Sequence, residues 1–213
     1  MFKKDLTPGS RSKVKSSVQR ALRNQFVETH PGFEPYIDEV LPKKASLEAV
    51  KLYVSLIAFL AQIWGGSNKY INSLNPFLSP DRAVLYVVDS KPIFFQTAHS
   101  PLLPHLRILH EFPNALPTIG IDRGAIRFVL SGATLMAPGL TSPGGRLPDP
   151  LNNPEDKPLQ AGAIVGITAE GKQEICMVGE LKMGTEEMKA KNKGAVIDEG
   201  HYLGDGLWKL AFD

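Results

Sequence analysis

Short apolar runs separated by glycines fill the C-terminal half of the chain, and this spacing constrains the fold more than any other feature. Four such runs follow one another: "AIVGITAE", "ICMVGELKM", "AVIDEGHYLG" and "LWKLAF". Each is long enough for one strand and is bounded by turn-forming residues. Short strands with frequent turns are typical of a small barrel or sandwich. We therefore predict a compact β domain in this half of the chain.

The N-terminal half carries both helical and strand-like patterns. Residues 11–29 have an apolar residue at every fourth position, at Val14, Val18, Leu22 and Phe26. This period predicts an amphipathic helix, which His30-Pro31-Gly32 would end. Residues 83–96, "AVLYVVDSKPIFFQ", predict a hairpin that turns at Asp89-Ser90. The expected class is α+β, with an N-terminal α/β domain over residues 1–96 and a β-barrel domain over residues 97–213.

Composition and charge limit the function classes. The net charge is only +2, but the first 25 residues carry a local basic patch: Lys3, Lys4, Arg11, Lys13, Lys15, Arg20 and Arg23 against the single acid Asp5. Such a patch suits a phosphate-rich partner. The most apolar run, residues 54–64, is shorter than the roughly 20 residues that span a bilayer. With one cysteine and no secretory signal pattern, we expect a soluble cytoplasmic protein that binds no membrane.

The segment "IDRGAIRFVLSGATLMAPGL", residues 121–140, predicts a helix that Asp122 caps and Pro138-Gly139 stops. Its expected core face is Ile126, Val129, Leu130 and Ala133, and its expected exposed face is Arg123, Arg127 and Ser131. Two arginines one turn apart can bind successive phosphates, because a guanidinium matches phosphate oxygens in a bidentate way. The same spacing fits an ordinary solvated face, and the pattern alone does not choose between them.

The order of several segments adds a resemblance to known proteins. Residues 121–140, followed by "GAIVGI" and "ICMVGELKMGTEEM", resemble the PUA domain, a small β-barrel that binds RNA. The whole chain resembles the malignant T-cell-amplified sequence protein family, known in yeast as translation machinery-associated proteins. The further matching segments are "MFKK", "SRSKVKSSVQR", "KPIFFQ", "TSPGG", "KAKNKG" and "HYLGDGLWKL". They run in order from the first residue almost to the last.

The resemblance implies a non-enzymatic translation factor without a cofactor. Members of this family pair with the density-regulated protein, mainly through the N-terminal domain. The pair binds the small ribosomal subunit and its rRNA, near the site of tRNA. It promotes reinitiation, tRNA release and subunit recycling. The resemblance implies neither DNA nor membrane as a partner.

The resemblance also implies which residues face RNA. In the family, the helix of the PUA domain and the loop after it form the RNA-facing groove. The matching positions expected to contact RNA are Arg123, Gly124, Arg127, Gly132, Ala133, Met136, Pro138 and Gly139. Lys182 and Gly184, in "LKMG", are expected beside that groove. Lys13, Lys15 and Arg20, on the expected N-terminal helix, are candidates for ribosomal RNA, although an ordinary solvated face explains them as well.

One segment departs from the family pattern. Where the family passes directly from one strand to the next, residues 54–82 form an insertion with an apolar start, a Gly65-Gly66 break and a Ser/Asn/Pro-rich end. A loop of this length is uncommon inside a compact domain. It is either a lineage-specific loop or a retained intron, and sequencing the transcript distinguishes the two.

The sequence contains no pattern typical of an enzyme or a metal site. The five histidines lack the spacing of a zincin motif, and the single Cys176 cannot form a cysteine-based site. Nucleotide-binding glycine loops and the Gly-x-Ser-x-Gly elbow are also missing. A second hypothesis remains: an RNA-binding accessory of an RNA-modification enzyme, because PUA domains are often joined to such enzymes. The first 96 residues carry no acid–base or nucleophile constellation that would supply the catalytic half.

Overall fold

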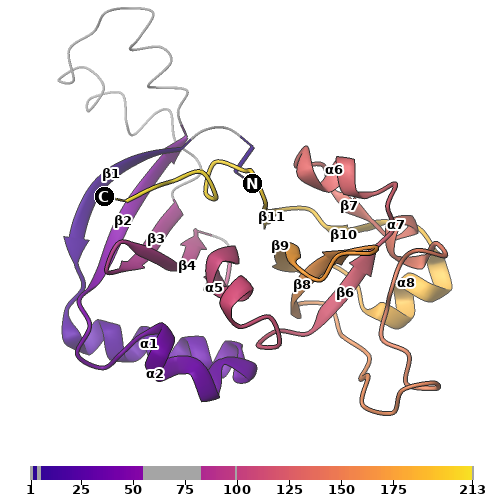
Figure 1. Cartoon of the computed structure of the whole chain (residues 1–213), viewed down its shortest axis with the longest axis horizontal. Coiled ribbons are helices and arrows are strands. Elements are labelled where there is room, and N and C mark those ends of the chain that lie inside the picture. Colours follow the sequence, from indigo (N-terminus) through magenta and orange to yellow (C-terminus); the bar gives the residue numbers. More distant parts are fainter. Residues whose placement is uncertain (1, 4–5, 55–82, 99, 213) are drawn as a thin grey trace, which may run out of the picture.

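The computed structural model describes residues 2–3, 6–98 without 55–82, and 100–212, and it confirms the α+β class. Most of the expected insertion at residues 54–82 lies outside the described residues. Figure 1 shows two groups of strands side by side, with helices around and between them.

The N-terminal group is one antiparallel sheet. Its strands are β1 (Leu6–Lys13), β2 (Leu47–Val54), β3 (Ala83–Val88), β4 (Lys91–Thr97) and β5 (Leu103–Pro104), and they lie in chain order. The hairpin between β3 and β4 is confirmed. Its turn residues Asp89 and Ser90 have φ angles of 47° and 64°. A tight hairpin of type I′ requires positive φ at both central positions, which Asp tolerates better than most residues.

The first helix begins later than the sequence predicts. Helix α1 spans Ser16–Thr29 and is followed by a 3₁₀ turn, η1 (Pro31–Tyr36), and by α2 (Ile37–Val40). Residues 11–13 belong to β1, so Lys13 lies on a strand, and Lys15 immediately precedes the helix. These positions correct the expectation that both lie on the helix. Strand β1 pairs with β2 on one side only and is an edge, where polar residues are tolerated.

Helix α1 packs on the sheet through Phe26. The centroid of the Phe26 ring lies 5.0 Å from that of Phe33 and 5.2 Å from that of Phe94. Aromatic pairs at this separation stabilise a core beyond the area that they bury. Leu22 is also buried, but Val18 is 48% exposed, so the predicted apolar stripe is wrong at that position. Gln19 is buried instead, and its amide donates to the carbonyl of Ala45.

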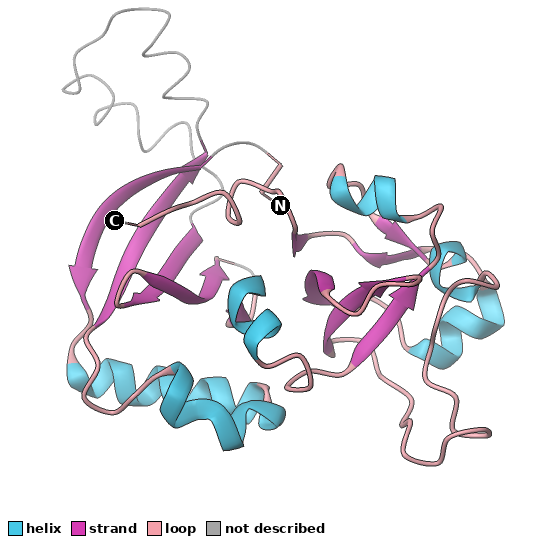
Figure 2. Ribbon diagram, viewed as in Figure 1, coloured by secondary structure: helices cyan, strands magenta, loops and turns pink. Residues whose placement is uncertain are grey.

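The C-terminal group contains two separate sheets within the described residues. Strands β6 (Thr118–Ile121), β8 (Ile164–Ala169), β9 (Ile175–Glu180) and β11 (Gly200–Tyr202) form one sheet in the order β11-β9-β8-β6, and β7 (Leu135–Met136) pairs with β10 (Ala195–Ile197). The expected barrel is therefore not a single closed sheet. Helices α6 (Ile126–Leu130), α7 (Pro138–Thr141) and α8 (Thr185–Lys191) flank the sheets (Figure 2). The run at residues 207–212, expected as a strand, forms no strand.

Two hydrophobic cores follow this division, but the first extends beyond residue 96. Strand β5 and helix α5 (Leu106–Glu111) contribute to the N-terminal core, which continues to Leu116. This core also takes in residues from later in the chain: Ile164, Ile175, Val178, Leu207 and Leu210. The second core begins at Ile119 and includes the inner faces of the C-terminal sheets. The change of packing therefore falls at residues 117–118, after the boundary expected at residues 96–97.

A buried histidine at the start of α5 makes stability depend on pH. Burial, followed by the nearby His201, lowers the pKa of His105 well below its ordinary value of 6.5. Below pH 6.5 the unfolded chain binds a proton that the folded chain refuses. The free energy of unfolding therefore falls on acidification. The contribution of neutral His105 to this free energy is complete only above pH 6.5.

We expect His105→Asn to weaken this dependence. The asparagine oxygen can still accept the backbone N–H of Arg107, which His105 Nδ1 accepts at 3.1 Å. Urea unfolding at pH 7.5, 6.5 and 5.5 measures the effect. Below pH 6.5, the free energy of unfolding of the wild-type protein should fall by up to about 1.4 kcal/mol more per pH unit than that of the variant. Parallel pH curves would contradict the role of His105.

Candidate nucleic-acid interface

A groove of about 700 Å³ lies between α6, β7 and α7. It is lined by Asp122, Gly124, Ala125, Arg127, Phe128, Val129, Ala133, Thr134, Leu135, Met136, Pro138, Gly139 and Ser142. Six of the residues expected at an RNA-facing groove are thus brought together: Gly124, Arg127, Ala133, Met136, Pro138 and Gly139. Its walls come from one continuous segment of chain, residues 122–142.

The wall of the groove begins with a turn that Asp122 organises. One carboxylate oxygen of Asp122 accepts the backbone N–H of Ala125 at 2.7 Å, and the other accepts the hydroxyl of Ser142. The Ser142 hydrogen bond lowers the pKa of Asp122, so the carboxylate stays ionised near neutral pH. Asp122 therefore closes the turn that precedes the helix. The prediction that it caps the helix is wrong, because the N-cap residue is Ala125 and no side chain caps the helix there. The helix itself contains only Ile126–Leu130, because residues 123–125 form a turn before it.

Large apolar side chains are exposed around this groove. Phe128, Leu130 and Met136 are 52%, 43% and 46% exposed. Leu130 was expected in the core, and that prediction is wrong because the short helix turns it outward. The guanidinium carbon of Arg127 lies 4.7 Å from the centroid of the Phe128 ring. An aromatic ring beside a cation can hold an unpaired base by stacking while the cation binds its phosphate.

The two arginines keep their charge available. Arg123 and Arg127 are both exposed, and neither forms an ion pair with any residue that the structure describes. The backbone N–H of Arg123 donates to Glu170 at 2.9 Å, so its position in the turn is held through the main chain. Arg123 does not line the groove. It lies in the turn of residues 123–125, next to Asp122. Both guanidinium groups can therefore reach an external anion.

Gly132 and Gly139 are required by packing within the protein. Gly132 has a φ of 72°, and a Cβ there would lie 2.5 Å from the hydroxyl of Tyr202. A Cβ on Gly139 would lie 2.9 Å from the Cβ of Ala125. These glycines allow α6 to end and α7 to approach the Asp122 turn. Gly132 does not line the groove, and its contact with RNA remains a prediction.

Lys182 lies apart from the groove. Its backbone N–H donates to Val196 in β10, the strand that pairs with β7. Lys182 lines a second hollow of about 280 Å³, together with three acids: Glu180, Asp198 and Glu199. Those carboxylates would repel a phosphate. The expectation that the Lys182 side chain stands beside the groove is therefore corrected.

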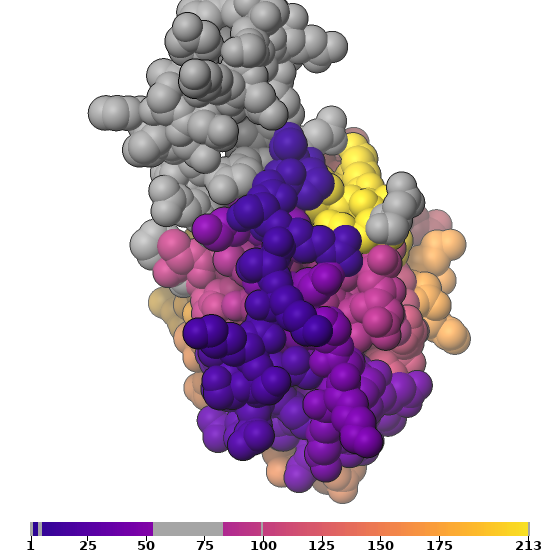
Figure 3. All heavy atoms as spheres, turned by 90° about the vertical axis from the view of Figure 1, so that its left-hand side faces the viewer, coloured from indigo at the N-terminus to yellow at the C-terminus, as the bar shows by residue number. Residues whose placement is uncertain are grey.

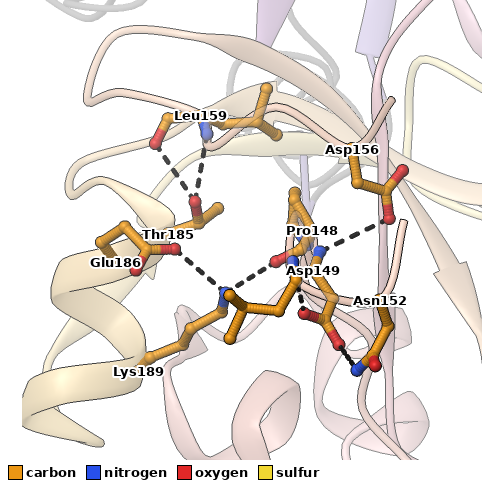
Figure 4. A network of polar contacts seen from close by, with 9 residues as sticks. Pro148, Asp149, Asn152, Asp156, Leu159, Thr185, Glu186 and Lys189 are labelled. Atoms are coloured by element: carbon orange, nitrogen blue, oxygen red, sulfur yellow. Dashed lines mark hydrogen bonds and ion pairs between the residues drawn. The ribbon is translucent and has the colours of Figure 1, made fainter. Parts of the chain in front are cut away.

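Gly184 also lies outside the groove, where α8 meets the proline-rich loop. Thr185, the first residue of α8, donates its backbone N–H to Leu159 and accepts the N–H of Leu159 on its hydroxyl at 3.0 Å. Lys189 donates to the carbonyl of Pro148 at 2.7 Å (Figure 4). A Cβ on Gly184 would lie 3.1 Å from the Leu159 carbonyl. Gly184 therefore serves the contact between helix and loop.

The N-terminal basic residues form a separate surface. Lys13, Lys15 and Arg20 are exposed and make no ion pair within the described ranges. Figure 3 shows the indigo N-terminal residues running down one face of the molecule, with the yellow C-terminal tail beside them. Figure 1 places β1 and α1 at the other end of the molecule from α6. The predicted basic residues thus divide into two distant surfaces.

The described residues lack three other kinds of feature: a metal site, a reactive thiol and a membrane-spanning helix. No group of three His, Cys, Asp or Glu side chains among them could hold a metal ion. Burial raises the pKa of the Cys176 thiol to about 11, so the thiol stays protonated and unreactive near neutral pH. Of the helices that the structure describes, none has the length and apolar character needed to cross a membrane.

Comparison with known families matches both halves of the chain. The Pre-PUA-like domain matches residues 2–65 and 68–113, and the PUA domain matches residues 117–203. The groove lies within the PUA match. The change of packing at residues 117–118 falls beside the junction of the two matches.

Curated relatives match along nearly the whole chain. Translation machinery-associated protein 20 of Saccharomyces cerevisiae is 42% identical over 204 residues, which cover 96% of this chain and 94% of the relative. Malignant T-cell-amplified sequence 1 homolog of Drosophila melanogaster is 38% identical over 212 residues, covering 98% and 97%. Malignant T-cell-amplified sequence 2 of Homo sapiens is 36% identical over 197 residues, covering 92% and 89%. The chain belongs to the family of translation machinery-associated protein 20 and malignant T-cell-amplified sequence proteins.

Solved structures share the fold. A hypothetical protein of Pyrococcus horikoshii OT3 matches with a TM-score of 0.62 at 17% identity, covering 95% of this chain and 100% of that chain. A PUA domain protein of Aeropyrum pernix K1, solved with tartrate, matches with a TM-score of 0.60 at 18% identity, covering 96% and 91%. The fold of this chain is thus shared by archaeal proteins of very different sequence.

Proposed function

We propose that this protein is a non-enzymatic translation factor that binds the small ribosomal subunit through RNA. The observation that carries the proposal is the groove, in which the guanidinium of Arg127 stands over the exposed ring of Phe128. An unpaired base would stack on Phe128 or Met136, and Arg123 and Arg127 would bind its phosphates. The names of the relatives support a role in translation, and the PUA match supports RNA as the ligand.

The second basic surface would extend this contact. Lys13, Lys15 and Arg20 would bind rRNA phosphates while the groove holds an unpaired segment or the end of a tRNA. Two weak contacts on one rigid particle reinforce each other, because the second becomes intramolecular once the first has formed. This arrangement fits a factor that acts with a density-regulated-protein homologue in reinitiation, tRNA release and subunit recycling in the cytoplasm. In this scheme the protein supplies binding surfaces and its partner completes the complex.

Gel filtration and sedimentation test this proposal. At micromolar concentration the purified protein should co-elute with the density-regulated-protein homologue, and the pair should sediment with small ribosomal subunits. A catalytic assay is not needed, since binding is the predicted activity. The large subunit serves as the control particle. Separate elution of the two proteins would contradict the proposed heterodimer. Equal sedimentation with both ribosomal subunits would contradict specificity for the small subunit.

A further inference from the structure

The motif "HYLGDGLWKL", residues 201–210, lies where the two groups of strands meet. His201 and Tyr202 belong to β11, which pairs with β9 in the C-terminal sheet. The chain then leaves this sheet and runs across to the N-terminal sheet, as the tail in Figure 2 shows. Leu207 and Leu210 are buried in the N-terminal core. One short segment therefore belongs to both packing units.

A buried carboxylate holds the segment in one shape. Asp205 is 1% exposed, and one of its oxygens accepts from His201 Nδ1 at 2.9 Å and from the backbone N–H of Tyr202 at 3.1 Å. Its other oxygen accepts the backbone N–H of Trp208 at 2.8 Å. A buried carboxyl group that accepts three hydrogen bonds is a geometrically defined arrangement. The turn from β11 to the tail is therefore fixed from within.

The same segment is held from the N-terminal unit by aromatic contacts. The His201 ring centroid lies 4.5 Å from that of His105 and 5.5 Å from that of Phe95. The Trp208 ring stacks on His105 at 6.3 Å with an interplanar angle of 10°. His105 is itself fixed, since its backbone N–H donates to Ile93 in β4. His105, His201 and Asp205 are almost fully buried, so the contact cannot slide without exposing polar groups.

Hydrogen bonds extend these contacts on both sides. Arg107 donates to the carbonyls of Trp208 and Leu210 at 3.3 and 3.2 Å. The backbone N–H of Gly206 donates to Phe2 at 2.8 Å. Toward the groove, the Tyr202 hydroxyl lies so close to Gly132 that a Cβ on Gly132 would clash with it, and Gly132 is the second residue after α6. The segment thus contacts the N-terminal unit and the rear of the groove wall.

We propose that residues 201–208 form a rigid joint that sets the direction of the groove relative to the N-terminal sheet. His105, His201 and Asp205 are its positioning residues, and none of them lines the groove. Densely packed contacts of this kind hold one arrangement instead of deforming continuously. The joint keeps the groove and the Lys13–Arg20 surface at a constant separation, which two simultaneous contacts with one particle require.

Distance measurements between fluorescent labels test the joint directly. Labels on Lys44→Cys and Lys172→Cys report the separation of the two units, because both lysines are exposed and the native Cys176 is buried. The parent double-cysteine protein should give one narrow distance distribution. His105→Asn and Trp208→Leu, each in that background, should at least double its width. Trp208→Phe in the same background keeps an aromatic ring on His105, so it should keep the narrow distance distribution of the parent.

His30→Gln is the matched control. His30 is a buried histidine of the N-terminal unit whose ring contacts the Leu102 carbonyl at 2.7 Å, away from the joint. Its variant should keep the narrow distribution even if it loses stability. If His105→Asn does not fold, the Trp208 pair decides alone, because Trp208 is only partly buried. Distributions as narrow as the parent's in every folded joint variant would overturn the proposal.

A binding experiment connects the joint to the proposed function, on which this second test rests. Trp208→Leu should bind a short unpaired RNA as the wild type does, since the groove is intact. Its affinity for the small subunit should fall about tenfold, because the two surfaces no longer engage together. An equal loss of affinity for both ligands would overturn the proposal of a joint. Failure of the wild-type protein to bind either ligand would overturn the proposed function and leave the distance result standing.

Discussion

Arg123→Glu combined with Arg127→Glu should reduce the affinity for an unpaired RNA oligonucleotide by about a hundredfold. Each charge-assisted contact contributes at least about 1.5 kcal/mol, and a tenfold change in affinity corresponds to 1.4 kcal/mol. The dependence on salt should flatten as well. On a single strand each lost phosphate contact lowers the slope of log affinity against log salt by roughly 0.7, so two contacts lower it by about 1.4.

The matched control for this variant is Lys43→Glu combined with Lys44→Glu. It makes the same change in net charge at two exposed lysines of the N-terminal unit, outside the groove. Fluorescence anisotropy over a series of salt concentrations measures both quantities. If the two variants weaken binding equally, the loss reflects net charge and the groove is not the site. An unchanged salt slope in the arginine variant would show that neither arginine binds a phosphate.

Phe26→Ala should cost about 3–5 kcal/mol of the free energy of unfolding. The Phe26 side chain is fully buried and contacts three rings, those of His30, Phe33 and Phe94. Its removal leaves a cavity between α1 and the sheet that the surrounding aromatic groups cannot close without leaving their rotamers. A loss of this size is a large fraction of the stability of an ordinary domain.

Val18→Ala on the same helix is the control for that variant. Val18 is 48% exposed, so its truncation should change stability by at most about 0.5 kcal/mol. Urea unfolding followed by circular dichroism gives both values. Comparable losses for the two variants would mean that the helix packs through the stripe expected from the sequence. A small loss for Phe26→Ala alone would mean that the core under α1 is loosely packed.

The parts of the fold that sequence reasoning predicts well are those in which local and tertiary preferences agree. The β3–β4 hairpin is an example, because β-branched runs flank two residues that tolerate positive φ. The end of α1 at Thr29 is another, since Pro31 cannot continue the helix. In both places a single short segment contains the information, and no distant contact is needed.

Elsewhere distant contacts decide the structure. Residues 11–13 continue a helical pattern but pair with β2 across the chain, at Glu48, Ala49 and Val50. Val18 fits the apolar period, yet Gln19 and Leu22 are the buried residues, and the Gln19 amide donates to carbonyls of the 42–45 loop. The tail resembles a strand but joins a core formed mostly by the N-terminal half. None of these partners can be read from local spacing.

The residues of the candidate site also divide into those that a local segment predicts and those that distant contacts place. The charged and small positions of the groove follow from the family pattern, because they lie within one continuous segment. Phe128 was missed: as part of a long helix it would have been one apolar residue among several, and only the five-residue α6 exposes it. Lys182 was misplaced because its sequence motif says nothing about the three carboxylates that the fold gathers around it.

The contribution of Leu207 and Leu210 to the N-terminal core has a consequence for how the protein is made. Synthesis is vectorial, and N-terminal domains usually fold first while the rest of the chain is still being made. Here the first unit lacks part of its interior until Leu207 and Leu210 have been synthesised and have left the ribosome. The N-terminal unit therefore reaches its full stability only after most of the C-terminal unit has been made.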